Sequence, residues 1–144
     1  MRMLRGYIFD TCVFNRLADG KIGLTEISAN GKFYATHVQL DELRATKQHV
    51  RREELVAVFK EVGPNLLPTE TFVWGVSGFG SKWSDGQLFN NLKACLDAKE
   101  KKANNAQDAV IAEVAIRQSL ILVTADRYLA EAARQHGANV QLIP

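Results

Sequence analysis

Apolar positions along the chain fall into two patterns, short continuous runs and longer helical stripes. The continuous runs are typical of strands covered on both faces, and they lie at 7–9, 33–35 and 120–123. The stripes repeat every three or four residues and predict helices at 51–62, 87–100, 104–118 and 127–136. Because strands and helices alternate along the chain, the pattern predicts an α/β protein with a parallel sheet covered by helices on both faces.

Turn-forming and capping residues set the limits of these elements. Gly63-Pro64 ends the 51–62 helix, and Gly137 closes the 127–136 helix. Thr36 is placed to cap the helix that follows the second strand. A further strand is expected over 66–74, interrupted at its start by Pro68, and a last one over 140–143. Residues 75–86, rich in Gly and Ser, predict a loop.

Length and composition describe an ordinary globular chain. The 144 residues predict one domain, 1–144, and 47% hydrophobic with 24% charged residues is a normal balance. A net charge of +2 neither indicates nor excludes a nucleic-acid partner. The two cysteines lack metal-ligand spacing, which favours a reducing compartment. Since no apolar run approaches the ~20 residues of a membrane span and no signal peptide is evident, we expect a cytoplasmic protein with no membrane partner.

Four acids lie where the predicted sheet would bring them together. Asp10 follows the first strand, Glu42 lies in the helix after the second, Asp108 opens the 104–118 helix, and Asp126 follows the strand after it. Carboxyl ends of parallel strands share one edge, so these side chains are expected to converge there. Converging carboxylates repel unless a cation joins them, and hard oxygen ligands select Mg²⁺ or Mn²⁺. Such an ion can activate water against a phosphodiester.

Each acid taken alone has a simpler interpretation. An Asp between a strand and a helix is often an N-cap, which applies to Asp10, Asp108 and Asp126. Glu42 alone would most often be a solvated surface residue. Only the joint pattern at one predicted edge favours a metal site.

Four short motifs carry a family resemblance. FDT near the amino end, QLDEL, DAVIAEVA and LVTAD resemble, in order and spacing, the motifs of the PIN-domain family over nearly the whole chain. The resemblance implies a three-layer α/β/α sandwich around a parallel sheet of about five strands. It also implies a metal-dependent ribonuclease. Many such bacterial and archaeal proteins are VapC-like toxins of type II toxin–antitoxin modules, so an RNA substrate, an antitoxin partner and a homodimer are expected.

The resemblance also assigns roles to individual residues. It places Asp10, Glu42, Asp108 and Asp126 in the family's acidic quartet, as catalytic residues and as ligands for Mg²⁺ or Mn²⁺. It places two hydroxyl residues beside that quartet, orienting it: Thr11 and Thr124. Two features depart from the family pattern. Cys12 stands where Asn or Ser is common, which predicts weaker polar support for Asp10, and the segment 72–85 is longer than a compact toxin usually has.

Several cations and aromatic residues are candidates for RNA contact. Those nearest the proposed site are Arg44, Lys82 and Arg127. The aromatic residues of 74–83 can stack unpaired bases, grip an antitoxin helix or pack the loop onto the core, and packing is the favoured interpretation. Lys99, Lys101 and Lys102 form a short basic run whose default interpretation is a solvated helix end, with a phosphate track as the alternative.

The sequence therefore predicts a Mg²⁺- or Mn²⁺-dependent endoribonuclease that hydrolyses RNA with a metal-activated water, with a toxin role implied by the resemblance. The alternative is a catalytically inactive PIN-like module that binds RNA or a partner. A phosphatase of the haloacid-dehalogenase type needs an acid two residues after its nucleophile, and Cys12 stands there. A phosphoacceptor receiver needs an acidic pair before its first helix, and no dinucleotide-binding motif is present.

Overall fold

A five-stranded parallel sheet forms the centre of the protein. The computed structural model describes residues 5–68 and 86–144. Across the sheet the strands follow the order β3-β2-β1-β4-β5. Their bounds are β1 Gly6–Phe9, β2 Lys32–Ala35, β3 Asn65–Leu66, β4 Ile121–Thr124 and β5 Asn139–Leu142. Every neighbouring pair is parallel, which confirms the predicted sheet.

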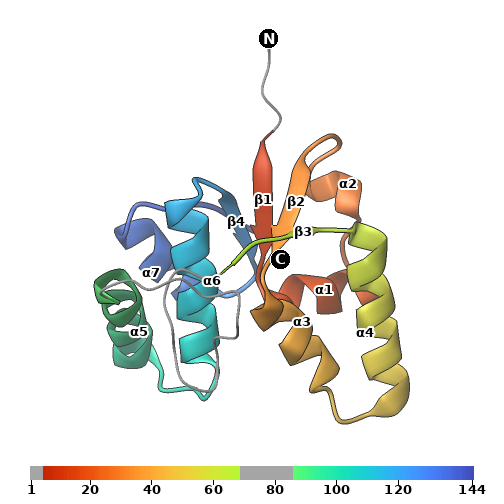
Figure 1. The fold of residues 1–144 in the computed structure, drawn as a ribbon, viewed down its shortest axis with the longest axis horizontal. Coiled ribbons are helices and arrows are strands. Elements are labelled where there is room, and N and C mark those ends of the chain that lie inside the picture. The colour runs from red at the N-terminus through yellow and green to blue at the C-terminus, as the bar shows by residue number, and fades with distance from the viewer. Residues whose placement is uncertain (1–4, 69–85) are drawn as a thin grey trace.

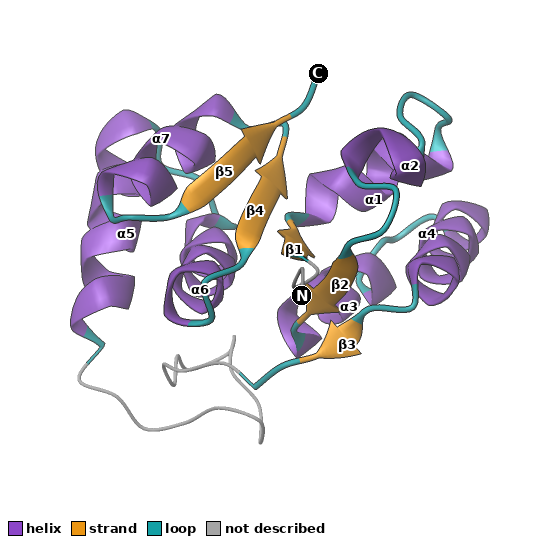
Figure 2. Cartoon of the chain, turned by 90° about the horizontal axis from the view of Figure 1, so that it is seen from above, coloured by secondary structure: helices purple, strands orange, loops and turns teal. Residues whose placement is uncertain are grey.

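Helices cover both faces of this sheet. In the described residues they are α1 Thr11–Ala18, α2 Leu24–Ile27, α3 His37–Arg44, α4 His49–Val62, α5 Gln87–Lys99, α6 Asn105–Arg117 and α7 Arg127–Gln135. Figure 1 shows α5, α6 and α7 on one side of the strands and α1 to α4 on the other, and Figure 2 shows the same layers from above. The predicted three-layer α/β/α sandwich is thus confirmed. No helix within 5–68 and 86–144 is long and apolar enough to cross a membrane.

Alternate residues of the central strands supply two separate cores. Ile8 and Leu122 are fully buried and pack with the α5–α7 layer. Phe9 and Val123, their neighbours along the same strands, are 1% and 0% exposed and pack with α1 and α4. Successive side chains of a strand point to opposite faces, so continuous apolar runs are what a sheet covered on both sides requires. The rigid pair β1 and β4 is therefore held from both faces.

Helix α6 is buried on nearly all sides. Its residues 109–112, 114 and 115 are 0–1% exposed, so it lacks the wet face of the other helices. Alanine alternates with β-branched residues along this stretch, which lets α5, α7 and the strands pack closely against it. Because the helix is fixed in the core, its first turn holds Asp108 in a defined position next to the sheet.

The structure refines three parts of the predicted pattern. Helix α6 begins at Asn105 with Asn104 at the N-cap, so Asp108 lies in the first turn, as predicted, and is not the cap. A short helix, α2, lies between β1 and β2, where the sequence predicted no second helix. Strand β3 covers only Asn65 and Leu66, because Pro68 cannot donate to the ladder. The rest of the predicted third strand and the loop 75–85 lie outside the described residues.

A buried capping box fixes the start of α3. Thr36 Oγ1 accepts a hydrogen bond from Val38 N at 3.1 Å, which confirms the predicted cap. Gln39 completes the box, since its Oε1 accepts from Thr36 N at 2.9 Å. The Gln39 amide also donates to Phe9 O at 3.0 Å, which ties α3 to the end of β1. The box therefore sets the position of α3, and of Glu42 on it, relative to Asp10.

Replacing Gln39 with alanine should lower the free energy of unfolding by about 2–4 kcal/mol, because the second half of the capping box is lost and the buried Thr36 N–H and Phe9 C=O lose their partners. Gln48→Ala is the matched control. Gln48 caps α4 from an exposed position, so its loss should cost only about 0.5–1 kcal/mol. Urea denaturation measures both values. Equal losses in the two variants would contradict the role assigned to Gln39.

Candidate active site

Two of the four predicted acids lie at the point where the strand order of the sheet reverses. The chain builds β2 and β3 on one side of β1, then returns to place β4 and β5 on the other. Asp10 follows β1, and Asp126 comes two residues after β4, the strand next to β1. In open parallel sheets the crevice at such a switch point, outside the carboxyl ends of the strands, is where ligands bind. The topology therefore places both carboxylates at a preferred binding position.

The other two acids reach the same region from helices on opposite faces of the sheet. Glu42 comes from α3 and Asp108 from the first turn of α6. Burial raises the pKa of Asp108 to about 9, and the charges of Asp10, Glu42 and Asp126 act on it in the same direction. Glu42 in turn has its pKa raised to about 7, by burial and by the charge of Asp10. Asp10, Glu42 and Asp126 thus all lie within electrostatic range of Asp108.

Asp10 is the most enclosed member of this group. It is 5% exposed, and it occupies the N-cap position of α1 without making a side-chain cap bond. Burial raises its pKa, and the charge of Asp126 adds to the effect, although hydrogen bonds from Cys12 and Thr124 oppose it. Asp10 is therefore not explained as a cap. Only Asp126 caps, with Oδ1 accepting from Tyr128 N at 2.9 Å and Leu129 N at 3.3 Å.

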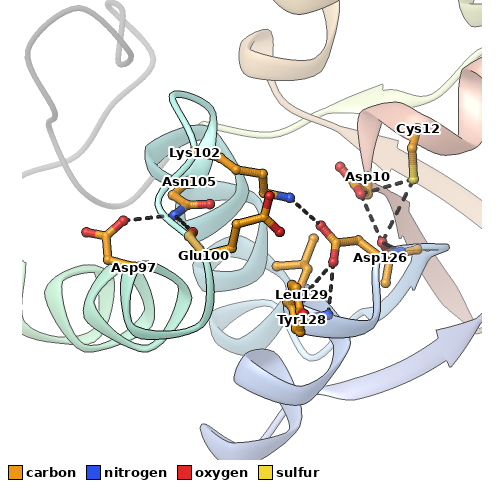
Figure 3. Close-up of polar contacts among 10 residues, drawn as sticks. Asp10, Cys12, Asp97, Glu100, Lys102, Asn105, Asp126, Tyr128 and Leu129 are labelled. Carbon is orange, nitrogen blue, oxygen red and sulfur yellow. Dashed lines mark hydrogen bonds and ion pairs between the residues drawn. The ribbon is translucent and has the colours of Figure 1, made fainter.

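Three short side chains hold the carboxylates in place. Thr124 Oγ1 donates to Asp10 Oδ2 at 2.9 Å, and Thr11 Oγ1 donates to Glu42 Oε1 at 3.0 Å. Both threonines therefore contact acids of the quartet. Cys12 Sγ also donates to Asp10 Oδ2, at 3.1 Å (Figure 3). The expected loss of polar support at Cys12 is thus only partial, because burial raises the pKa of this thiol to about 12 and keeps its proton available.

A lysine at the site was missed as a site residue. Lys102 precedes α6, and its Nζ lies 3.1 Å from Asp126 Oδ2 (Figure 3). The sequence interpretation placed it on a solvated helix end, because the helix stripe ends near residue 100. What brings it to the acids is the return of the chain between α5 and α6, which no local pattern encodes. The one available signal was that it lies six residues before Asp108.

The donor set suits a hard cation, but its side chains are not gathered around one point. Within the described ranges, no three or more His, Cys, Asp or Glu side chains come close enough together to hold a metal ion. Asp10, Glu42 and Asp126 each turn an oxygen toward a protein donor instead. Buried carboxylates whose mutual repulsion raises their pKa are nevertheless the ligands that Mg²⁺ or Mn²⁺ stabilises. The donor set therefore fits such an ion by its chemistry, and not by the present arrangement of the side chains.

The predicted RNA contacts lie at the edge of this site or outside the described residues. Arg127 is exposed at the first position of α7, next to Asp126. Arg44 is exposed two residues after Glu42 and lines a hollow of about 360 Å³ together with Arg52 and Lys60. Lys82 and the aromatic residues of 74–83 lie outside the described residues. Both described arginines are exposed, Arg127 next to Asp126 and Arg44 beside Arg52 and Lys60 of α4.

A larger hollow, of about 680 Å³, lies at the opposite edge of the sheet. It is lined by the amino ends of β1, β4 and β5 with Ser119. None of its lining residues is an acid, histidine or cysteine, so it lacks the carboxylates that the proposed chemistry needs. Its size therefore does not make it the better candidate for an active site.

Comparison with known proteins identifies the fold. The sequence matches no protein-family model and no curated protein. The structure is similar to VapBC2 from Rickettsia felis bound to a DNA fragment from their promoter, with 16% identity, a TM-score of 0.60 and coverage of 96% of this chain and 99% of that one. It is also similar to VapBC-5 from Mycobacterium tuberculosis (22%, TM-score 0.56, coverage 96% and 97%) and to FitAcB from Neisseria gonorrhoeae (15%, TM-score 0.53, coverage 93% and 95%).

These likenesses define the class of fold. Each covers nearly all of both chains, so the whole described architecture is shared. The chain has the PIN-like fold of VapC-type proteins, as its four sequence motifs indicated. At identities of 15–22% the likeness shows the fold alone.

The raised pKa of Asp108 has a consequence for stability. Its folded-state pKa of about 9 exceeds the ordinary 3.8, so the folded protein retains a proton that the unfolded chain releases. Without metal, the contribution of Asp108 to stability should therefore be greatest below about pH 4 and should fall as the pH rises toward 9. Asp108→Asn should raise the melting temperature in EDTA at pH 8 and change it much less at pH 4.

Asp97→Asn serves as the control for that measurement. It also removes one carboxylate charge, but the hydrogen bond from Lys93 lowers the pKa of Asp97. It should lower the melting temperature at pH 8 rather than raise it. Differential scanning calorimetry at the two pH values measures both changes. A loss of stability in Asp108→Asn at pH 8 would contradict the proposed repulsion.

Proposed function

We propose that this protein is a Mg²⁺- or Mn²⁺-dependent endoribonuclease. The observation that supports the proposal is the set of four carboxylates that follow β1 and β4 or lie on α3 and α6, two of them at the switch point of the sheet. Three of them, Asp10, Glu42 and Asp108, have a raised pKa. If these carboxylates had only a structural role, gathering like charges in a partly buried space would not stabilise the fold. Binding of a divalent cation supplies the compensation, and phosphodiester hydrolysis is a reaction that such a cation supports.

The residues of the site would divide the work. Asp10, Glu42, Asp108 and Asp126 would hold the ion, which when bound activates a water and neutralises charge on the phosphate. Thr11 and Thr124 keep Glu42 and Asp10 oriented through the hydrogen bonds described above. Hydrolysis by water needs no 2′-hydroxyl nucleophile, so the products should carry a 5′-phosphate. Arg44 and Arg127, which are both exposed, would contact the phosphates of the RNA strand.

The solved structures that share this fold support a toxin role. VapBC-5 is described as a member of the VapBC family of toxin–antitoxin systems, and FitAcB and VapBC2 share its architecture. We infer by analogy that this chain is the toxin of such a pair, restrained by a cognate antitoxin protein, and that it forms a homodimer. This part of the proposal is supported by fold alone, whereas the nuclease proposal also has its own side chains.

The alternative is an inactive PIN-like module that binds RNA or a protein partner. Its support is that the described acids, as placed, do not converge on a single point. The two functions differ in what they require. Binding alone needs neither the divalent cation nor a particular protonation state of the carboxylates.

Glu42→Gln should reduce the rate of RNA cleavage by about 10²-fold or more, since it removes a charge from the proposed ion site. Asp41→Asn is its matched control, because Asp41 is the adjacent acid and is exposed. It should cut RNA at the wild-type rate. A fluorescent RNA substrate with Mg²⁺ or Mn²⁺ gives the rates, and a 5′-phosphate-dependent exonuclease identifies the product ends.

Two results would speak against the nuclease. Wild-type protein that binds RNA but cuts none with either ion would favour the inactive module. Equal rates in Glu42→Gln and wild type would assign any observed cleavage to a contaminant or another site.

A further inference from the structure

Lys102 brings a positive charge into contact with the acids. Its Nζ donates to Asp126 Oδ2 at 3.1 Å, with side chains 32% and 23% exposed, so the pair is partly shielded from water (Figure 3). Lys102 therefore forms a close ion pair with one acid of the quartet.

The buried side chain of Asn105 holds the loop that carries Lys102. Asn105 is 1% exposed, and its Nδ2 donates to Glu100 O and to Asp97 Oδ1, both at 2.8 Å (Figure 3). Its backbone N–H donates to Lys102 O at 3.2 Å. Asp97 is itself held by Lys93 Nζ at 2.8 Å. Moving the loop would leave the buried Nδ2 group of Asn105 without its partners, so the fold holds the backbone position of Lys102.

The position of this ammonium bears on how many metal ions the site can take. In two-metal sites the ions lie about 3.5–4 Å apart and share carboxylate ligands between them. Here Asp126 is already engaged on both oxygens, one by the amides of α7 and the other by Lys102. A second divalent ion at Asp126 would have to displace the lysine and would meet its positive charge. A single divalent ion shared by the four acids would leave room for the ammonium on Asp126, because a carboxylate has about four lone-pair sites on its two oxygens.

We propose that the Lys102 ammonium takes the place of a second metal ion beside Asp126, so that the site binds one divalent cation per chain. The inference rests on the proposed function for the presence of that cation. Lys102 is a positioning residue that holds Asp126 and supplies fixed positive charge where a phosphodiester substrate would gather negative charge. The site then contains two cations, the Lys102 ammonium and one divalent ion, and only the divalent ion can exchange.

Mn²⁺ alone is the probe that tests this arrangement. Isothermal titration calorimetry, with electron paramagnetic resonance to count bound ions, should give one Mn²⁺ per wild-type chain. Lys102→Met should bind two, because Asp126 Oδ2 is released and the repelling charge is gone. Lys102→Arg keeps the charge and should bind one. Lys101→Met is the matched control, since Lys101 is the adjacent, exposed lysine, and it should also bind one.

A second measurement shows whether Lys102→Met remains folded and does not depend on cleavage. In EDTA at pH 8 its melting temperature should fall below that of wild type, because a cation is removed from the acids. Saturating Mn²⁺ should then raise it by more than it raises the wild type.

The outcomes separate this inference from the nuclease proposal. Wild type that binds one Mn²⁺ and cuts RNA, with Lys102→Met still binding one, would overturn the inference and leave the nuclease intact. Two ions on the wild-type chain would do the same. A wild-type chain that binds no Mn²⁺ and cuts no RNA would overturn both.

Discussion

Repulsion among buried carboxylates is the constraint on which the rest of this structure depends. Asp10 lies 5% exposed at the end of the central strand β1, with Asp126 beyond the end of its neighbour β4 and Asp108 facing both from α6. Each charge raises the free energy of ionising the others, in a space where water cannot screen them well. The molecule accepts this penalty at the one edge of its sheet where a ligand is expected.

The surroundings of the acids reduce the penalty without removing it. Thr11, Cys12 and Thr124 donate hydrogen bonds to carboxylate oxygens, and Lys102 supplies one positive charge. Even so, the pKa of Asp108 stays at about 9, far above its ordinary value. The metal-free protein is therefore protonated at some of these groups near neutral pH, and binding a cation must release protons. Affinity for the metal and the pH of the solution are consequently linked.

The scaffold contributes rigidity rather than chemistry. Core side chains on both faces of β1 and β4 hold the ends of these strands, and the buried helix α6 fixes the third acid. Gln39 ties α3 to the last residue of β1. Residues on such a scaffold cannot move apart to relieve their repulsion, so compensation has to come from protons, from Lys102 or from a bound ion.

Much of this arrangement could be predicted from the sequence, because it follows from local patterns. The continuous apolar runs before Asp10 and Asp126 predicted buried parallel strands, and parallel strands place their carboxyl ends together. What escaped prediction depended on tertiary structure. Asn104 rather than Asp108 takes the N-cap of α6, and Cys12 donates a bond because burial keeps its proton. Lys102 reaches Asp126 only because the buried Asn105 turns the loop back toward the sheet.

The most direct test of the account is the anomalous scattering of Mn²⁺ in crystals of the protein grown with that ion. The account predicts one strong peak at the carboxyl edge of β1 and β4, within ~2.5 Å of oxygens from at least two of Asp10, Glu42, Asp108 and Asp126. A saturated crystal with no peak at that edge, and with the four acids still bonded only to protein donors, would contradict it.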